Sequence, residues 1–188
     1  MVTKIAICGK ANSGKNTLAN LLSMYLDSKC TKICAFADPI KEIILTTFPQ
    51  ADRSALYGPS YRRKELVPGL LFNGAPVSYR QLLKDFGEWA KRYDGLVWVN
   101  ALNDKLEAFN GTLFIVSDLR FQVELDYLKS KDFTIINIFR DSQEKSLDNH
   151  ASEKEQEYFD KHAFDFIIDN NISIEELSNK VRVLCNKI

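Results

Sequence analysis

Nine residues near the N-terminus have the composition and spacing of a phosphate-binding loop. The pattern is Gly9, four further residues, then Gly14 and Lys15. Glycines allow the backbone to turn its N–H groups toward phosphate oxygens, and the lysine adds a mobile positive charge. An apolar run at residues 4–8 predicts a strand before the loop, and apolar residues at helical spacing predict a helix over residues 15–27. We therefore expect a nucleoside triphosphate to bind here. The predicted binding residues are Gly9, Lys10, Ala11, Asn12, Ser13, Gly14, Lys15, Asn16 and Thr17.

Two residues are candidates to bind a magnesium ion beside this loop. Asn16 stands where such loops usually carry Ser or Thr, whose hydroxyl binds Mg²⁺. An amide oxygen can also bind Mg²⁺ or hold one of its waters. Asp118 follows an apolar strand, at a position where an acid holds the metal directly or through water, although it is also placed to cap the next helix. We expect Mg²⁺, with Asn16 and Asp118 as ligands.

Three further charged residues follow predicted strands and are candidate catalytic or binding groups. Arg120 could neutralise charge during phosphoryl transfer, or pair on the surface with Asp118 or Glu124. Asp38 could accept a proton from the attacking oxygen or orient a substrate hydroxyl, and helix capping is the alternative. Lys41, one turn later, could contact a phosphate or lie in solvent. We assign Lys15, Arg120 and Asp38 to catalysis, and Asp38 and Lys41 also to substrate binding.

A cationic run and one aromatic residue are candidates for binding the second substrate. Residues 61–64 read Tyr-Arg-Arg-Lys, which suits an anionic acceptor, although charge runs are most often solvated. Arg80 opens a predicted helix at residues 78–92, with Ser78 as its cap. Trp98 could stack on a base, but aromatic residues at helical spacing are more often part of the core. The predicted acceptor residues from these segments are Arg62, Arg63, Arg80 and Trp98.

The elements that must position these residues alternate along the chain as strands and helices. Such alternation predicts crossover connections, a five-stranded parallel sheet and a three-layer α/β fold. The predicted strands are 3–8, 32–36, 112–117, 134–139 and 164–168. The predicted helices are 15–27, 38–47, 78–92, 95–109, 121–130, 153–160 and 173–186.

Two stretches interrupt this alternation. Residues 49–77 hold most of the prolines, and we interpret them as an insertion on the substrate side. Within it, residues 70–77 could form a hairpin around Asn73-Gly74, although Pro76 weakens that interpretation. Residues 141–157 are polar and could be a lid or an ordinary surface loop.

The composition limits the classes of function. The 188 residues suit one domain with an insertion. Equal numbers of basic and acidic residues, 25 each, argue against a general nucleic-acid binder. The N-terminus leads directly into a strand, no apolar run approaches a membrane span, and the four cysteines show no metal-type pairing. We expect a cytoplasmic protein without a nucleic-acid polymer or membrane as partner.

Taken in order, these segments resemble the phage-type deoxynucleoside monophosphate kinase family of phosphate-loop kinases. Two departures are Asn16, where the family's loop usually has Asp, and Gln122-Val123, where the family often has Pro-Asn. The matching stretches are residues 9–17, 36–41, 63–65, 78–87, 115–124, 150–153 and 165–170.

The resemblance implies transfer of the γ-phosphoryl group of ATP to a (deoxy)nucleoside monophosphate, in the host cytoplasm if the gene is a phage's. It implies that Asp118 serves the metal, Arg120 the transferring group, and Arg63 and Arg80 the acceptor phosphate. Asn170 would lie near the adenine. Arg140 completes the predicted ATP-binding set, and a homodimer is an open possibility.

Two other functions compete with this interpretation. Animal-type phosphomevalonate kinase is similar over the same loop and over the Pro-Ile-Lys of residues 39–41, so the acceptor could be another phosphorylated metabolite. The second alternative is a nucleotide-binding switch that hydrolyses ATP or GTP slowly and has no small acceptor. The cationic run at residues 61–64 favours a kinase.

Overall fold

The computed structural model describes residues 2–26, 30–141 and 159–188 and divides the chain into two compact units. The first, here called the sheet unit, comprises Met1–Ala35 and Asp104–Ile188. The second, the inserted unit, comprises Phe36–Asn103 and contains the whole of the predicted insertion at residues 49–77. Each unit has its own apolar core.

The sheet unit is built on five strands that are all parallel, in the order β2-β5-β1-β6-β7. The first strand is central, and its residues Ile5, Ala6 and Ile7 are fully buried, as expected for a strand covered on both faces. This topology confirms the predicted fold class. The strands are β1 (Thr3–Cys8), β2 (Thr31–Cys34), β5 (Leu113–Leu119), β6 (Thr134–Phe139) and β7 (Phe166–Asp169).

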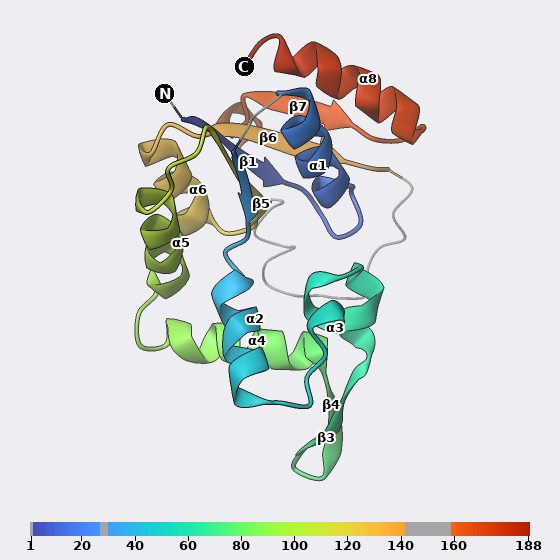
Figure 1. The fold of residues 1–188 in the computed structure, drawn as a ribbon, viewed down its shortest axis with the longest axis vertical. Coiled ribbons are helices and arrows are strands. Elements are labelled where there is room, and N and C mark those ends of the chain that lie inside the picture. Colours follow the sequence, from blue (N-terminus) through green and yellow to red (C-terminus); the bar gives the residue numbers. More distant parts are fainter. Residues whose placement is uncertain (1, 27–29, 142–158) are drawn as a thin grey trace. The chain divides into compact units, whose positions relative to one another are not determined.

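Helices cover the two faces of this sheet and complete the three layers. Helices α1 (Lys15–Tyr25) and α8 (Ile174–Cys185) contact each other and share one core cluster with the sheet. Helix α6 (Gln122–Ser130) lies on the other side (Figure 1). Alternate strand residues face α1 and α8, for example Ile5 and Ile7 of β1, because side chains alternate between the faces of a strand.

The inserted unit is mainly helical and carries one hairpin. The helices predicted at residues 38–47, 78–92 and 95–109 and the hairpin are confirmed, whereas the short helices at residues 53–57 and 60–64 were not predicted. Helix α5 contains the division between the units. The elements are α2 (Asp38–Thr47), α3 (Arg53–Tyr57), η1 (Ser60–Lys64), β3 (Leu66–Phe72), β4 (Ala75–Ser78), α4 (Tyr79–Lys91) and α5 (Val97–Glu107).

The hairpin forms where the Asn-Gly pair predicted it. Asn73 and Gly74 have φ angles of 50° and 81°, which suit a tight hairpin turn. Pro76 of β4 pairs with Leu71 of β3. A proline is tolerated there because each strand of a two-stranded sheet is an edge strand. The projecting hairpin is visible in the lower part of Figure 1. Its base is anchored by Val67 and Val77, which are buried in the core of the inserted unit.

Two predictions fall on residues that the structure does not describe. The predicted lid at 141–157 lies outside the described residues except for Asp141, and so does most of the predicted helix at 153–160. Residues 159 and 160 are not helical, and a short 3₁₀ helix, η2 (Lys161–Ala163), follows them. Within the described ranges, every helix is too short or too polar to cross a lipid bilayer.

We expect the predicted cap of α4 to matter for stability. The Ser78 hydroxyl accepts a hydrogen bond from the backbone N–H of Gln81 at 3.2 Å. Ser78→Ala should lower the free energy of unfolding by about 1 kcal/mol, because a backbone donor in the first turn loses its acceptor. Urea titration measures the difference. Ser78→Thr keeps an oxygen at this position and should stay within a few tenths of a kcal/mol of wild type; an equal loss in both variants would contradict the capping role.

Candidate active site

The loop between β1 and α1 folds so tightly that two of its positions have no room for a side chain. Gly9 has φ 152° and Gly14 φ 102°, values that L-residues rarely adopt. A Cβ atom on Gly9 would lie 2.6 Å from Ser13 Oγ, and one on Gly14 would lie 2.5 Å from Asn170 Nδ2. The two glycines of the sequence motif therefore stand where the backbone itself requires glycine. Such tight backbone packing is expected of a loop that turns its N–H groups toward a phosphate at the start of a helix.

Lys15 is the first residue of α1, and its ammonium group lies over the loop. Its Nζ donates hydrogen bonds to the carbonyl oxygens of Gly9 at 2.5 Å and Lys10 at 2.7 Å. The first turn of α1 contains no acidic residue, so the positive end of the helix dipole meets no anion of its own helix there. Ammonium group and helix terminus together favour an anion at the loop.

Asn170, which is distant from the loop in the sequence, contacts the loop directly. This residue follows β7, is almost fully buried, and donates through Nδ2 to the carbonyl oxygen of Ser13 at 2.9 Å. Its own backbone N–H donates to Phe139 O, and Arg140 Nε donates to Asn170 O, each at 2.9 Å. Asn170 and Arg140 were predicted to contact ATP. In the structure Asn170 bonds to the loop directly, and Arg140 bonds to the backbone of Asn170.

At the end of β5 the strand register changes beside the candidate metal ligand. Ala6 pairs with Val116 and Cys8 with Leu119, so three steps along β5 match two along β1. Such bulges occur next to active sites, where they redirect side chains. Asp118, which is half-buried, lies in the irregular stretch.

Glu124 supports the turn that carries Arg120. The Glu124 carboxylate is 5% exposed and accepts hydrogen bonds from the backbone N–H groups of Arg120 at 2.9 Å and Phe121 at 3.1 Å. From the sequence, Glu124 was expected only as a possible surface partner of the Arg120 side chain. A Glu in the first turn of a helix that reaches back to the chain before it is a known capping pattern, and this signal could have identified its role.

The end of β1 lies beside the segments that carry Lys15 and Arg120. Cys8 precedes Gly9, whose carbonyl oxygen accepts a hydrogen bond from Lys15, and Cys8 pairs with Leu119, which precedes Arg120. Two of the three predicted catalytic residues therefore belong to adjacent segments of the sheet unit. Burial raises the pKa of the Cys8 thiol to about 11, against the opposing influence of the positive charges of Lys15 and Arg120.

The donor set suits magnesium bound mainly through a nucleotide. Among the described residues, no group of three or more His, Cys, Asp or Glu side chains could enclose a metal ion. Mg²⁺ typically uses one or two protein oxygens and completes its shell with phosphate oxygens and waters. The amide oxygen of exposed Asn16 and the carboxylate of Asp118 are oxygen donors of this kind.

In the inserted unit, Asp38 and Lys41 form a mostly buried ion pair. Lys41 Nζ lies 2.8 Å from Asp38 Oδ1 and 4.5 Å from the centre of the Tyr57 ring. Helix α2 begins at Asp38 with Ala37 as its N-cap residue, so Asp38 stands one position after the cap position that the capping alternative gave it. The Tyr57 hydroxyl donates to Glu42 Oε1 at 2.5 Å, and burial together with this bond raises the pKa of Tyr57. Lys41 is thus held in place by an acid on one side and an aromatic ring on another.

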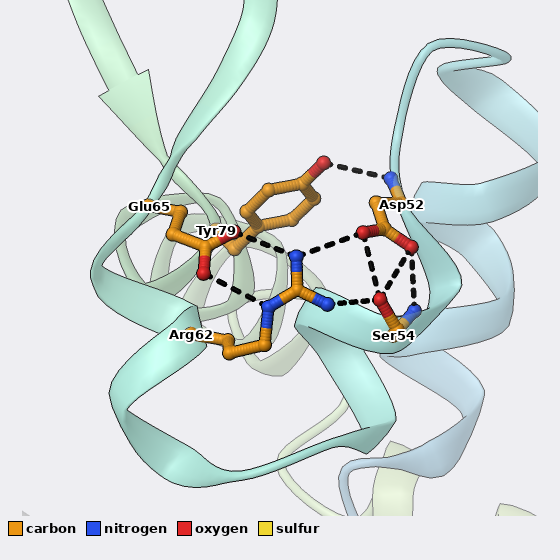
Figure 2. Close-up of polar contacts among 5 residues, drawn as sticks. All are labelled: Asp52, Ser54, Arg62, Glu65 and Tyr79. Carbon is orange, nitrogen blue, oxygen red and sulfur yellow. Dashed lines mark hydrogen bonds and ion pairs between the residues drawn. The ribbon is translucent and has the colours of Figure 1, made fainter.

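Trp98 and Arg62, both predicted to bind the acceptor, have structural contacts. Trp98 is 7% exposed, belongs to the core of the inserted unit, and donates from Nε1 to Gly87 O at 3.2 Å. This supports the core role that competed with base stacking. Arg62 is engaged by Asp52, Ser54 and Glu65 (Figure 2). We therefore leave both residues out of the proposed acceptor site.

Arg63 and Arg80 are the remaining predicted acceptor cations, and both are half-buried. Arg63 Nε donates to the backbone oxygen of Leu56 at 3.4 Å. Arg80 lies in the first turn of α4, directly after the buried Tyr79. Helix α4 contacts η1, the element that carries Arg63. The two arginines thus belong to neighbouring elements of one unit.

The fold and the loop together define a class of protein. A five-stranded parallel sheet with a glycine-bounded loop after its central first strand, and a lysine opening the next helix, is a phosphate-loop kinase fold. A family model described as "Deoxynucleotide monophosphate kinase" matches residues 70–181, more than half of the chain. The chain belongs to this family, as its motifs indicated. No curated protein matches the chain.

We expect the hydrogen bond from Asn170 Nδ2 to the carbonyl oxygen of Ser13 to contribute measurably to stability. Asn170→Ala should lower the free energy of unfolding by about 1–3 kcal/mol, because the carbonyl oxygen of Ser13 loses its donor in a buried place. Asn171→Ala is the matched control, since Asn171 exchanges its side-chain hydrogen bonds with exposed Asp141. Chemical denaturation of both variants measures the contrast. Equal losses would show that the Asn170 amide has no special role in holding the loop.

Proposed function

We propose that this chain transfers the γ-phosphoryl group of ATP to a deoxynucleoside monophosphate and releases ADP and the deoxynucleoside diphosphate. The proposal depends mainly on the agreement of two separate findings, the family match and the shape of the loop at residues 9–17. The family match covers residues 70–181 and contains none of the loop at residues 9–17. Independently, the loop has two glycines at positive φ with no room for a Cβ, which supports a backbone that turns its N–H groups toward phosphate.

The sheet unit supplies the candidate residues for ATP. Lys15 and the N-terminus of α1 favour the negative phosphate chain, and Asn170 keeps the loop in its shape. Arg120, whose backbone is fixed by Glu124, is the second positive charge at this end of β1. When bound by Asn16 and Asp118, Mg²⁺ would supply further neutralisation of phosphate charge.

The inserted unit supplies the candidate residues for the acceptor. Arg63 and Arg80 are suited to a phosphate because guanidinium groups bind phosphate oxygens in pairs. The ion pair of Lys41 and Asp38 offers a fixed ammonium group with its counter-charge already present. In the reaction an oxygen of the acceptor phosphate forms a bond to the γ-phosphorus, while the bond from that phosphorus to the β–γ bridging oxygen breaks and ADP leaves with the electron pair.

Such a reaction needs alignment and charge stabilisation more than covalent chemistry by the protein. Two anions repel each other, so cations from separate segments are needed. The proposal takes these cations from Lys15 and Arg120 of the sheet unit and from Arg63 and Arg80 of the inserted unit.

A panel of acceptors tests the proposal. The purified protein is assayed with ATP and Mg²⁺ against deoxynucleoside monophosphates, ribonucleoside monophosphates and phosphomevalonate. We expect a deoxynucleoside monophosphate to be converted to its diphosphate. Turnover of a different metabolite alone would replace the acceptor, and slow ATP or GTP hydrolysis that no acceptor stimulates would replace the kinase with a nucleotide switch.

Lys15→Ala should lower kcat by roughly 10²–10³-fold, as does the loss of one preorganised donor from other active sites. The protein should remain folded, because the hydrogen bonds of Lys15 Nζ to the carbonyl oxygens of Gly9 and Lys10 lie on the loop and outside the apolar core. Steady-state kinetics and circular dichroism measure the two effects. Lys32→Ala, a change at a lysine of β2, is the control and should retain activity. Near-wild-type turnover in Lys15→Ala would refute the assignment of the loop.

Arg80→Ala should raise the KM for the deoxynucleoside monophosphate roughly tenfold or more, since a charge-assisted hydrogen bond is worth about 1.5–3 kcal/mol. The KM for ATP should stay near its wild-type value. Arg92→Ala removes an exposed arginine just beyond the end of the same helix and should change neither constant. An increase confined to the KM for ATP would move Arg80 to the other substrate.

A further inference from the structure

Five residues of the inserted unit form a closed polar ring (Figure 2). Arg62 bonds to the Glu65 carboxylate through Nε and Nη2, each at 2.9 Å, and its Nη2 also bonds to Asp52 Oδ2 at 3.0 Å. Asp52 donates from its backbone N–H to the Tyr79 hydroxyl at 2.7 Å. The backbone N–H of Tyr79 donates to Glu65 O at 3.1 Å, which closes the ring. Ser54 fills the remaining corner between Asp52 and Arg62.

This ring joins four segments that are separate along the chain. Asp52 caps the start of α3, Arg62 lies in η1, Glu65 precedes β3, and Tyr79 opens α4. Tyr79 is 2% exposed, so the ring rests on the core of the unit. Helix α3 buries Ala55 and Leu56 in that core, whereas η1 has no buried residue, so the ring is the polar connection that joins η1 to its neighbours.

The donors of Arg62 are already used within the ring. Its guanidinium makes hydrogen bonds to both Glu65 oxygens, to Asp52 and to Ser54, which takes four of the five N–H donors of an arginine. The pKa values of Asp52 and Glu65 are both lowered, chiefly by hydrogen bonds from Ser54 and Arg62 respectively. A phosphate would have to displace carboxylates to reach this guanidinium. Arg62 is therefore poorly placed to be a substrate ligand.

The ring instead fixes the backbone beside both candidate acceptor arginines. Arg63 is the next residue after Arg62, and Arg80 is the next residue after Tyr79. The direct bond from the Tyr79 N–H to Glu65 O joins the turn after Arg63 to the turn before Arg80. Any movement of η1 against α4 would break at least one side of this ring.

We propose that Arg62 is a positioning residue, which through Glu65, Asp52 and Tyr79 holds Arg63 and Arg80 at the spacing needed for one acceptor phosphate. This inference rests on the proposed function. It predicts that the acceptor site fails when any member of the ring is removed, although no member of the ring touches the acceptor.

Glu65→Gln separates this proposal from direct binding by Arg62. If Arg62 positions its neighbours, Glu65→Gln weakens the ring and raises the KM for the deoxynucleoside monophosphate, as Arg62→Met does. If Arg62 itself binds the acceptor, Glu65→Gln frees the guanidinium, and the KM stays constant or falls. The double variant adds a second criterion, because residues in one network are non-additive.

The experiment compares Arg62→Met, Arg62→Lys, Glu65→Gln and the double variant Arg62→Met with Glu65→Gln. Arg53→Met is the matched control, because Arg53 belongs to the same unit and pairs with the exposed acid Glu42 outside the ring. We expect Arg62→Met and Glu65→Gln each to raise the acceptor KM about tenfold, equivalent to about 1.4 kcal/mol. The double variant should be no worse than Arg62→Met, and Arg62→Lys should recover part of the loss. The KM for ATP and the control should stay unchanged.

Amide hydrogen exchange tests whether the ring fixes the backbone of η1 and α4, and it does not require an activity assay. Arg62→Met should speed exchange at the backbone amides of Asp52, Glu65 and Tyr79, whereas Arg53→Met should not. Unaltered exchange there, or a lower acceptor KM in Glu65→Gln, would overturn the positioning role. If wild-type protein phosphorylates no nucleotide, the proposed function fails, and the exchange result still decides whether the ring fixes η1 and α4.

Discussion

The close approach of main-chain atoms at the end of β1 is the constraint on which the candidate ATP site depends. At Gly14 the backbone passes so near the Asn170 amide that no Cβ fits, and that amide holds the carbonyl of Ser13. The loop is thus clamped between the first strand and the segment after the last one. A clamped loop can present its N–H groups to phosphate without reorganising, which is the condition for strong electrostatic stabilisation. In the proposed reaction, Lys15 and Arg120 would add positive charge beside this loop.

Charge in the inserted unit is organised on a different principle. Cations there are paired before any substrate arrives: Lys41 lies against Asp38, and Arg62 against Glu65. Pairing balances each positive charge with a nearby acid and holds flexible side chains at defined positions. Arg62 uses four of its N–H donors on Glu65, Asp52 and Ser54. Arg63 and Arg80 directly follow ring residues in the sequence, and they are the arginines that we assign to the acceptor phosphate.

The sheet and the loop could be predicted because their signals are local. Apolar runs bounded by polar turns located the five strands, and the glycine spacing located the loop. Asn73-Gly74 likewise specified its own turn. The Asn170 contact could not be predicted, because it joins residues 157 positions apart and no local pattern records it. The hydrogen bond from the Asp52 N–H to the Tyr79 hydroxyl could not be predicted for the same reason, since it joins residues of separate segments. Arg62 and Arg63 look identical in the sequence, and only the position of Glu65 and Asp52 distinguishes the paired residue from its neighbour.

The central claim is that the loop at residues 9–17 binds the phosphate chain of ATP, and calorimetric titration of the folded protein with ATP and Mg²⁺ tests it most directly. The account predicts saturable binding with one ATP per chain, and a large loss of affinity when AMP, which lacks the β- and γ-phosphates, replaces ATP. A well-folded sample that shows no saturable heat with ATP would contradict the account.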